Sequence, residues 1–119
     1  MIFQLVVAEP MNGVVVISII GELDMANAPR LRTELVRIIA AEVTPLVVLD
    51  LAGVDLLDAT GLGVIFDGVK RSRLGGGDLA LARAEPQVQR DLDLMRVSEI
   101  LPLYESVDDA IQALQFGRP

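Results

Sequence analysis

Two side chains that could do chemistry stand at one predicted turn, where Asp58 and Thr60 precede a helical pattern of apolar residues. A carboxylate or hydroxyl in this position lies beside the unpaired backbone N–H groups that open a helix. Such a side chain can cap the helix. A hydroxyl there can also receive a phosphate from an enzyme, because the same N–H groups and the helix dipole favour an anion. On the pattern alone, a capping role is favoured over a chemical one.

Asp24 is a second candidate, because it also lies between a predicted strand and a predicted helix. An aspartate in that position is more often a cap than a catalyst. The carboxyl ends of parallel strands nevertheless tend to gather functional loops at one edge of a sheet. We therefore expect Asp24 and Asp58 to share one surface.

Other groupings of reactive residue types carry less weight. Asp50, Asp55 and Asp58 could suggest a magnesium site, but spacings of five and three residues in a strand-and-loop segment do not favour convergence. Three methionines are expected to fill gaps in the packing rather than to form a binding patch: Met11, Met25 and Met95. No combination of nucleophile, base and oxyanion hole can be assembled, so we expect no catalytic activity and no cofactor.

Composition excludes several classes of function. The chain has 119 residues and a net charge of −7, and it contains no histidine and no cysteine. The missing residue types remove the commonest general base and the usual ligands of structural zinc. The negative charge argues against nucleic acid or anionic lipid as a partner. No apolar run approaches the roughly 20 residues of a membrane span, and no secretory signal is visible. We therefore expect a cytoplasmic protein without membrane insertion.

Hydrophobic periodicity predicts strands that alternate with amphipathic helices. The first two strands are separated by Asn12-Gly13, a strong tight-turn signal, so they should form an antiparallel hairpin. The predicted strands are Phe3–Val7, Val14–Ile20, Leu46–Leu51, Leu79–Ala82 and a short edge strand at Leu101–Tyr104. The predicted helices are Ala26–Ala41, Gly61–Leu74, Pro86–Met95 and Ser106–Gln115.

This order predicts an α/β fold, with a mixed sheet of about four to five strands, an N-terminal hairpin and helices packed on the sheet. The third helix should turn Val88, Leu92 and Met95 inward, and Ser106 should cap the last helix. No linker, internal repeat or low-complexity tract interrupts the sequence. We therefore expect one domain over residues 1–119.

Four segments of the chain form a specific pattern when their order and spacing are taken together. They are Gly21–Asp24 (GELD), Val48–Leu51 (VLDL), Asp58–Val64 (DATGLGV) and the turn Gly75–Gly77. In this arrangement the chain resembles, over nearly its whole length, a STAS domain of the anti-sigma factor antagonist type. The resemblance implies a protein that binds an anti-sigma factor, itself a serine/threonine kinase related to the histidine kinases. Binding then frees a sigma factor for transcription.

The resemblance also implies a phosphate switch. In such antagonists the kinase uses ATP to phosphorylate a serine in the turn, which weakens the complex, and a phosphatase restores it. A phosphate adds about −1.5 to −2 charges to an interface packed without it. By motif position, Asp24 matches a residue at the kinase-facing surface and Asp58 matches the acid that opens the phosphorylation turn. The implied partner-binding residues are Asp24, Asp58, Ala59, Thr60, Gly61, Leu62 and, on the outer side of the helix, Asp67.

The sequence departs from the family at the phosphoacceptor, because Ala59 stands at its usual position and the next residue, Thr60, is the hydroxyl that remains. Three interpretations follow. Thr60 is the acceptor, displaced by one residue; or the switch is absent and abundance controls a permanently unphosphorylated antagonist; or the protein has taken another STAS role. We favour antagonist-type binding, with phosphorylation at Thr60 as the less favoured variant.

The alternative from another class is a binding module that senses a nucleotide or lipid, or that serves in a lipid-transport assembly. A ligand held between the Asp24 and Asp58 loops would favour it. An enzyme is the third class, and the absence of a catalytic constellation disfavours it.

Overall fold

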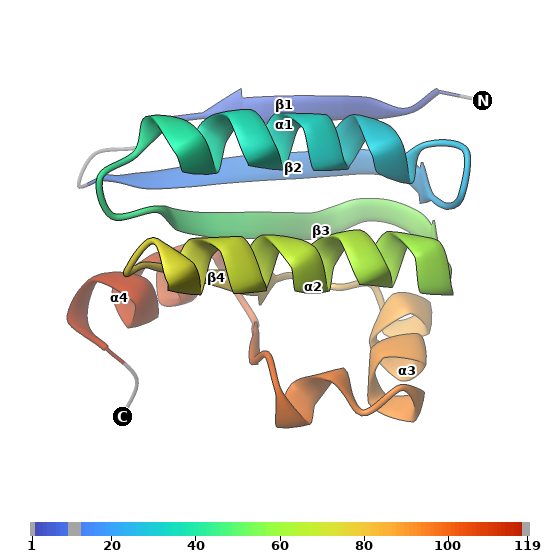
Figure 1. Ribbon diagram of the computed structural model, residues 1–119. Helices are drawn as coiled ribbons and strands as arrows, with labels where there is room; N and C mark the ends of the chain where they lie inside the picture. The colour runs from blue at the N-terminus through green and yellow to red at the C-terminus, as the bar shows by residue number, and fades with distance from the viewer. Residues whose placement is uncertain (1, 10–12, 118–119) are drawn as a thin grey trace.

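A five-stranded mixed sheet forms the centre of the fold (Figure 1). The computed structural model describes residues 2–9 and 13–117. In the order of the sheet, the strands are β1 (Gln4–Ala8), β2 (Val14–Leu23), β3 (Leu46–Leu57), β4 (Asp78–Ala82) and β5 (Leu103–Tyr104). Strand β1 runs antiparallel to β2, and the remaining neighbours are parallel. The α/β prediction and its N-terminal hairpin are confirmed. Asn12 of the predicted turn lies outside the described residues, and Gly13 after it has φ +76°.

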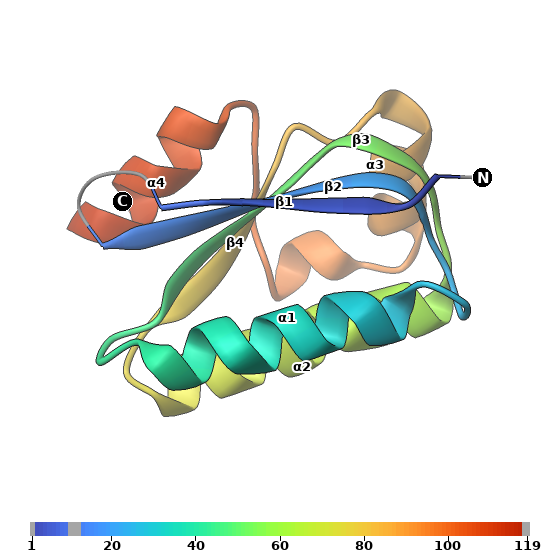
Figure 2. The same ribbon diagram turned by 90° about the horizontal axis from the view of Figure 1, so that it is seen from above.

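The helices cover both faces of this sheet. Within the described residues they are α1 (Ala28–Ala41), α2 (Ala59–Leu74), α3 (Pro86–Leu94) and α4 (Val107–Phe116), with a short 3-10 helix at Val97–Glu99. Helices α1 and α2 lie side by side on one face, and α4 lies on the other (Figure 2). None of the helices in residues 2–9 and 13–117 is long and apolar enough to cross a membrane.

Two apolar cores result from this arrangement. The larger core lies between the sheet and helices α1 and α2 and includes Ile17, Leu49 and Ile65. The smaller core lies under α4 and includes Val16, Val48 and Ala110. Because both faces of the central strands are covered for much of their length, β2 and β3 contain near-continuous apolar runs instead of an alternating pattern.

The two central strands are longer than the sequence predicts. Strand β3 continues past Leu51 to Leu57, and β2 continues to Leu23. The sequence predicts that this strand ends at Leu51, because the apolar run Leu46–Leu51 stops there, two residues before Gly53. In the sheet this glycine allows close approach, since an added Cβ would stand 3.0 Å from the carbonyl oxygen of Ile19. The extra length places the loops after β2 and β3 at one end of the molecule.

The third helix is shorter than predicted. It ends at Leu94, with Met95 as its C-cap. Val88 and Leu92 are buried as expected. The prediction that Met95 turns inward is wrong, because Met95 is 38% exposed. Once the helical turn stops, the following side chain no longer repeats the buried face. Met11, the first of the expected gap-fillers, lies outside the described residues.

The C-terminal elements follow the prediction with one shift. Strand β5 begins at Leu103 instead of Leu101, because Leu101 is buried in the core and Pro102 has no N–H to donate to a ladder. The cap of α4 is confirmed, since the Ser106 hydroxyl accepts a hydrogen bond from the N–H of Asp109 at 3.0 Å.

Candidate functional site at the start of helix α2

The loops after β2 and β3 meet at the carboxyl ends of two parallel strands. The last pair in the register is Leu23 with Leu57, so Asp24 and Asp58 follow at the same level. The N–H of Asp58 donates to the carbonyl oxygen of Leu23 at 3.3 Å. The expectation that the two aspartates share one surface is confirmed.

The carboxylate of Asp58 connects the two loops. Its Oδ1 accepts a hydrogen bond from the N–H of Gly61 at 2.8 Å, which caps α2. Its Oδ2 accepts a hydrogen bond from the N–H of Met25 at 3.0 Å, in the loop before α1. The cap predicted for Asp58 is therefore present, and the same side chain also holds the neighbouring loop in place.

Asp24 organises its own loop in a similar way. Its Oδ1 accepts hydrogen bonds from the N–H groups of Ala26 and Asn27, both at 3.0 Å. The Asn27 amide donates in turn to the carbonyl oxygen of Glu22 at 2.9 Å. Asp24 therefore binds the backbone N–H groups before α1, whereas the side chain of Asn27, at the N-cap position, makes no capping hydrogen bond.

The side chains exposed at this end of the molecule include those of Met25, Ala59 and Thr60. Ala59 and Thr60 are the first two residues of α2 and both are exposed. The Thr60 hydroxyl makes no hydrogen bond with the described residues. Met25 is 72% exposed, so its expected role as a gap-filler is wrong. Its backbone is fixed by Asp58, and its side chain points away from a core already filled by neighbouring residues such as Leu23.

Gly61 and Leu62 lie beneath this surface and are not part of it. Leu62 is 7% exposed and belongs to the larger core. Gly61 is buried where α2 crosses the end of β2, and an added Cβ would stand only 2.3 Å from the carbonyl oxygen of Leu23. Both residues set the position of the helix, and their role in partner binding stays a prediction.

Asp67 is a further residue on the exposed side of α2. It lies seven residues after Thr60, which brings it to the same side two turns later. Its carboxylate accepts a hydrogen bond from Arg71 at 2.7 Å, and its side chain is 32% exposed. The hydrogen bond from Arg71 lowers the pKa of Asp67, and the charges of Arg32 and Lys70 act in the same direction. Lys70 itself is exposed.

Asp50 forms an ion pair that the sequence does not reveal. The Nε and Nη2 atoms of Arg83 donate to its two carboxylate oxygens at 3.1 and 2.6 Å. Its side chain is 7% exposed. Burial raises the pKa of Asp50, but the hydrogen bonds from Arg83 and from the N–H of Ala52 outweigh this and leave it below its usual value.

The aspartates considered for a magnesium site are each held differently. Asp50 is paired with Arg83, Asp58 caps α2, and Asp55 is exposed on β3. The residues that the structure describes contain no group of three or more acidic, histidine or cysteine side chains placed to hold a metal ion.

Comparison with known proteins agrees with this architecture. The family described as STAS domain matches residues 6–110. An anti-sigma F factor antagonist from Paenibacillus polymyxa is 30% identical over 104 residues, which covers 87% of this chain and 89% of the relative. The chain belongs to the STAS domain family. An anti-sigma-B factor antagonist from Bacillus subtilis is also 30% identical, over 81% of this STAS chain and 86% of its own.

A solved structure extends the likeness to three dimensions. The crystal structure of an anti-sigma factor antagonist from Mycobacterium paratuberculosis superposes on this STAS domain with a TM-score of 0.80. The two sequences are 28% identical, and the match covers 95% of this chain and 94% of the other.

We expect the two glycines near the start of α2 to respond in opposite directions to alanine. Gly61→Ala should lower the free energy of unfolding by about 1–3 kcal/mol, because the new methyl group meets the backbone of Leu23. Gly63→Ala should raise it by about 0.5–1 kcal/mol, because Gly63 is exposed, its added Cβ meets nothing, and alanine favours a helix. Urea denaturation measures both. Equal effects would contradict the close contact at Gly61.

We also expect Arg83→Ala to lower the free energy of unfolding at pH 7 by about 1–2 kcal/mol, because it leaves the buried carboxylate of Asp50 without its cation. The lowered pKa of Asp50 stabilises the fold above the unfolded-state pKa, and this contribution is lost as the pH falls through the folded-state value.

The stability difference between wild type and Arg83→Ala should therefore shrink on acidification below about pH 4. Urea titrations across this range measure it, with Arg90→Ala on the exposed side of α3 as control. A difference that does not depend on pH would show that Arg83 acts through packing instead.

Proposed function

We propose that this STAS protein is a cytoplasmic anti-sigma factor antagonist that acts as one domain over residues 1–119. It binds an anti-sigma factor, a serine/threonine kinase of the histidine-kinase-like type, and so releases a sigma factor. The observation that carries the proposal is the single surface formed by the Asp24 loop and the start of α2, which Asp58 holds together. The names of the curated relatives support it.

The exposed groups on this surface suit a protein partner. Met25 offers an apolar side chain beside Ala59 and Thr60, and Asp24 and Asp58 are half-buried behind them. An exposed apolar residue beside a polar loop is a common contact in transient complexes. Asp67 extends the surface along α2 and adds negative charge, so the complementary surface of the kinase should be basic there.

The first turn of α2 decides whether a phosphate can control the complex. Ala59 offers no hydroxyl, and the Thr60 hydroxyl leaves the helix about 100° further round its axis. Asp58 already occupies the N–H of Gly61, so this donor cannot hold a phosphate on Thr60. In our proposal the protein remains unphosphorylated, its abundance sets the amount of free sigma factor, and no phosphatase is needed to reactivate it.

We expect incubation with the cognate anti-sigma kinase and ATP to leave the wild type unmodified and bound to the kinase. Ala59→Ser should restore an acceptor at the first position of α2, gain one phosphate and dissociate. Intact mass and native mass spectrometry read out both properties.

The alternatives give different results in the same experiment. A phosphate on the wild type that disappears in Thr60→Ala would show that the acceptor has moved by one residue. A failure to bind any anti-sigma kinase encoded beside this protein would contradict the proposed function.

Charge reversal tests the extent of the surface. We expect Asp67→Lys to weaken kinase binding about tenfold, because it places a cation against a basic partner. The free energy of unfolding should change by less than about 1 kcal/mol, because the ion pair with Arg71 is partly exposed. Titration calorimetry and urea denaturation give the two quantities. The control is Asp93→Lys, which makes the same charge change at an exposed position of α3. If the two variants bind the kinase with equal affinity, Asp67 is not part of the interface.

A further inference from the structure

Strand β1 leaves one edge of the sheet without a partner in the described chain. It is outermost in the strand order and pairs only with β2. The free N–H and C=O groups on such an edge can pair with another strand, and proteins usually prevent this with charges, proline or a bulge. The segment Gln4–Ala8 (QLVVA) contains no charged residue and no proline, and its register with β2 is continuous.

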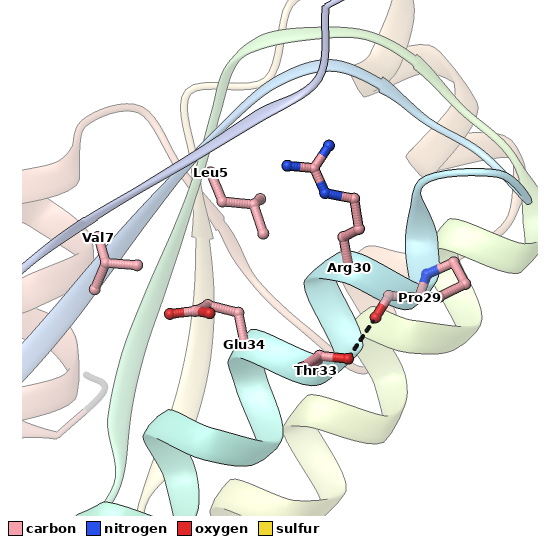
Figure 3. Close-up of a pocket in the computed structure, with 6 residues that line it drawn as sticks. All are labelled: Leu5, Val7, Pro29, Arg30, Thr33 and Glu34. Carbon is pink, nitrogen blue, oxygen red and sulfur yellow. Dashed lines mark hydrogen bonds between the residues drawn. The ribbon is translucent and has the colours of Figure 1, made fainter.

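A groove runs along the same edge (Figure 3). Its volume is about 500 Å³, and it lies between β1 and the first half of α1. Leu5 and Val7 form the strand side. The helix side is formed by Pro29, Arg30, Thr33 and Glu34. A strand added to this edge would lie about 4.8 Å outside β1. Its side chains on the α1 side would therefore enter the groove.

We propose that this edge binds β1 of a second copy of the chain, in antiparallel register about a twofold axis at Val6. In that register Val6 faces its own counterpart, Leu5 faces Val7 and Gln4 faces Ala8. Each pair joins residues on the same face of the extended sheet, because side chains alternate along a strand. The Leu5 and Val7 side chains of both copies then fill one continuous groove.

The opposite face of β1 gains burial in the same way. Val6 is 51% exposed there, on the side of the sheet where it stands beside Ser18 of β2. Pairing about the twofold axis places the two Val6 side chains in direct contact. Side chains directly opposite each other on neighbouring strands are the contacts that stabilise a sheet.

Charge at this edge does not oppose a second copy, although the whole chain carries −7. The strand itself is neutral. On α1 both signs occur together, since Glu34 pairs with Arg37. Arg30 donates to the carbonyl oxygen of Phe3 at 3.2 Å and lies over its ring at 5.1 Å. The edge and groove therefore add little like-charge repulsion to a contact with themselves.

A cysteine at the axis gives the sharpest test, because the chain contains no other. Directly opposed residues of an antiparallel pair stand about 4.5–5.5 Å apart at Cα, within the range of a disulfide. We expect mild oxidation to convert Val6→Cys into a covalent dimer with unchanged circular dichroism. The control is Val43→Cys, at a site 96% exposed, which should remain largely monomeric. Equal cross-linking of the two variants would overturn the register.

The oligomeric state without a cross-link completes the experiment. By analytical ultracentrifugation the wild type should dimerise as its concentration rises. Val6→Lys should raise the dissociation constant at least about tenfold, because two ammonium groups meet at the axis, and Val43→Lys should leave it unchanged. A wild type that stays monomeric at all accessible concentrations would overturn the proposal. So would a Val6→Lys variant that still dimerises like the wild type.

Discussion

The two hydrogen bonds accepted by the carboxylate of Asp58 are the constraint on which this end of the molecule depends. One comes from Gly61 in the first turn of α2 and the other from Met25 in the loop after β2. Through them, a helix start and a loop that are far apart in sequence become one rigid surface. The contact between Gly61 and the carbonyl oxygen of Leu23 fixes the same helix from below. The exposed side chains gain a defined arrangement without contributing to it themselves.

The start of a helix favours a bound anion, and at the start of α2 this anion is the carboxylate of Asp58. Asp58 supplies the negative charge, so the N–H of Gly61 is not available to another group. In a chain with a hydroxyl at position 59, a phosphate would arrive next to this carboxylate and repel it. An alanine at that position keeps the same helix start in one charge state. The surface that we propose for partner binding then has a constant shape and charge.

Much of this could be predicted from the sequence, because the signals are local. Asp58 before a helical pattern indicates a cap, and apolar runs such as Leu46–Leu51 indicate strands covered on both faces. The full length of β3 could not be predicted, because the apolar run ends at Leu51 and the rest of the strand depends on its pairing with β2. The pairing of Asp50 with Arg83 was also beyond prediction, since the two residues are 33 positions apart and no periodic pattern connects them. The exposure of Met25 depends on tertiary packing in the same way.

The hydrogen bond from Met25 to Asp58 is made by backbone atoms, and this has a consequence for how related proteins diverge. Residue 25 can change its side chain without altering the position of the loop, and residues 59 and 60 are equally free because their side chains make no internal contacts on which the fold relies. In related proteins, substitution at these few surface positions can therefore change what the surface contacts. The scaffold beneath them stays constant, so the fold tolerates such changes.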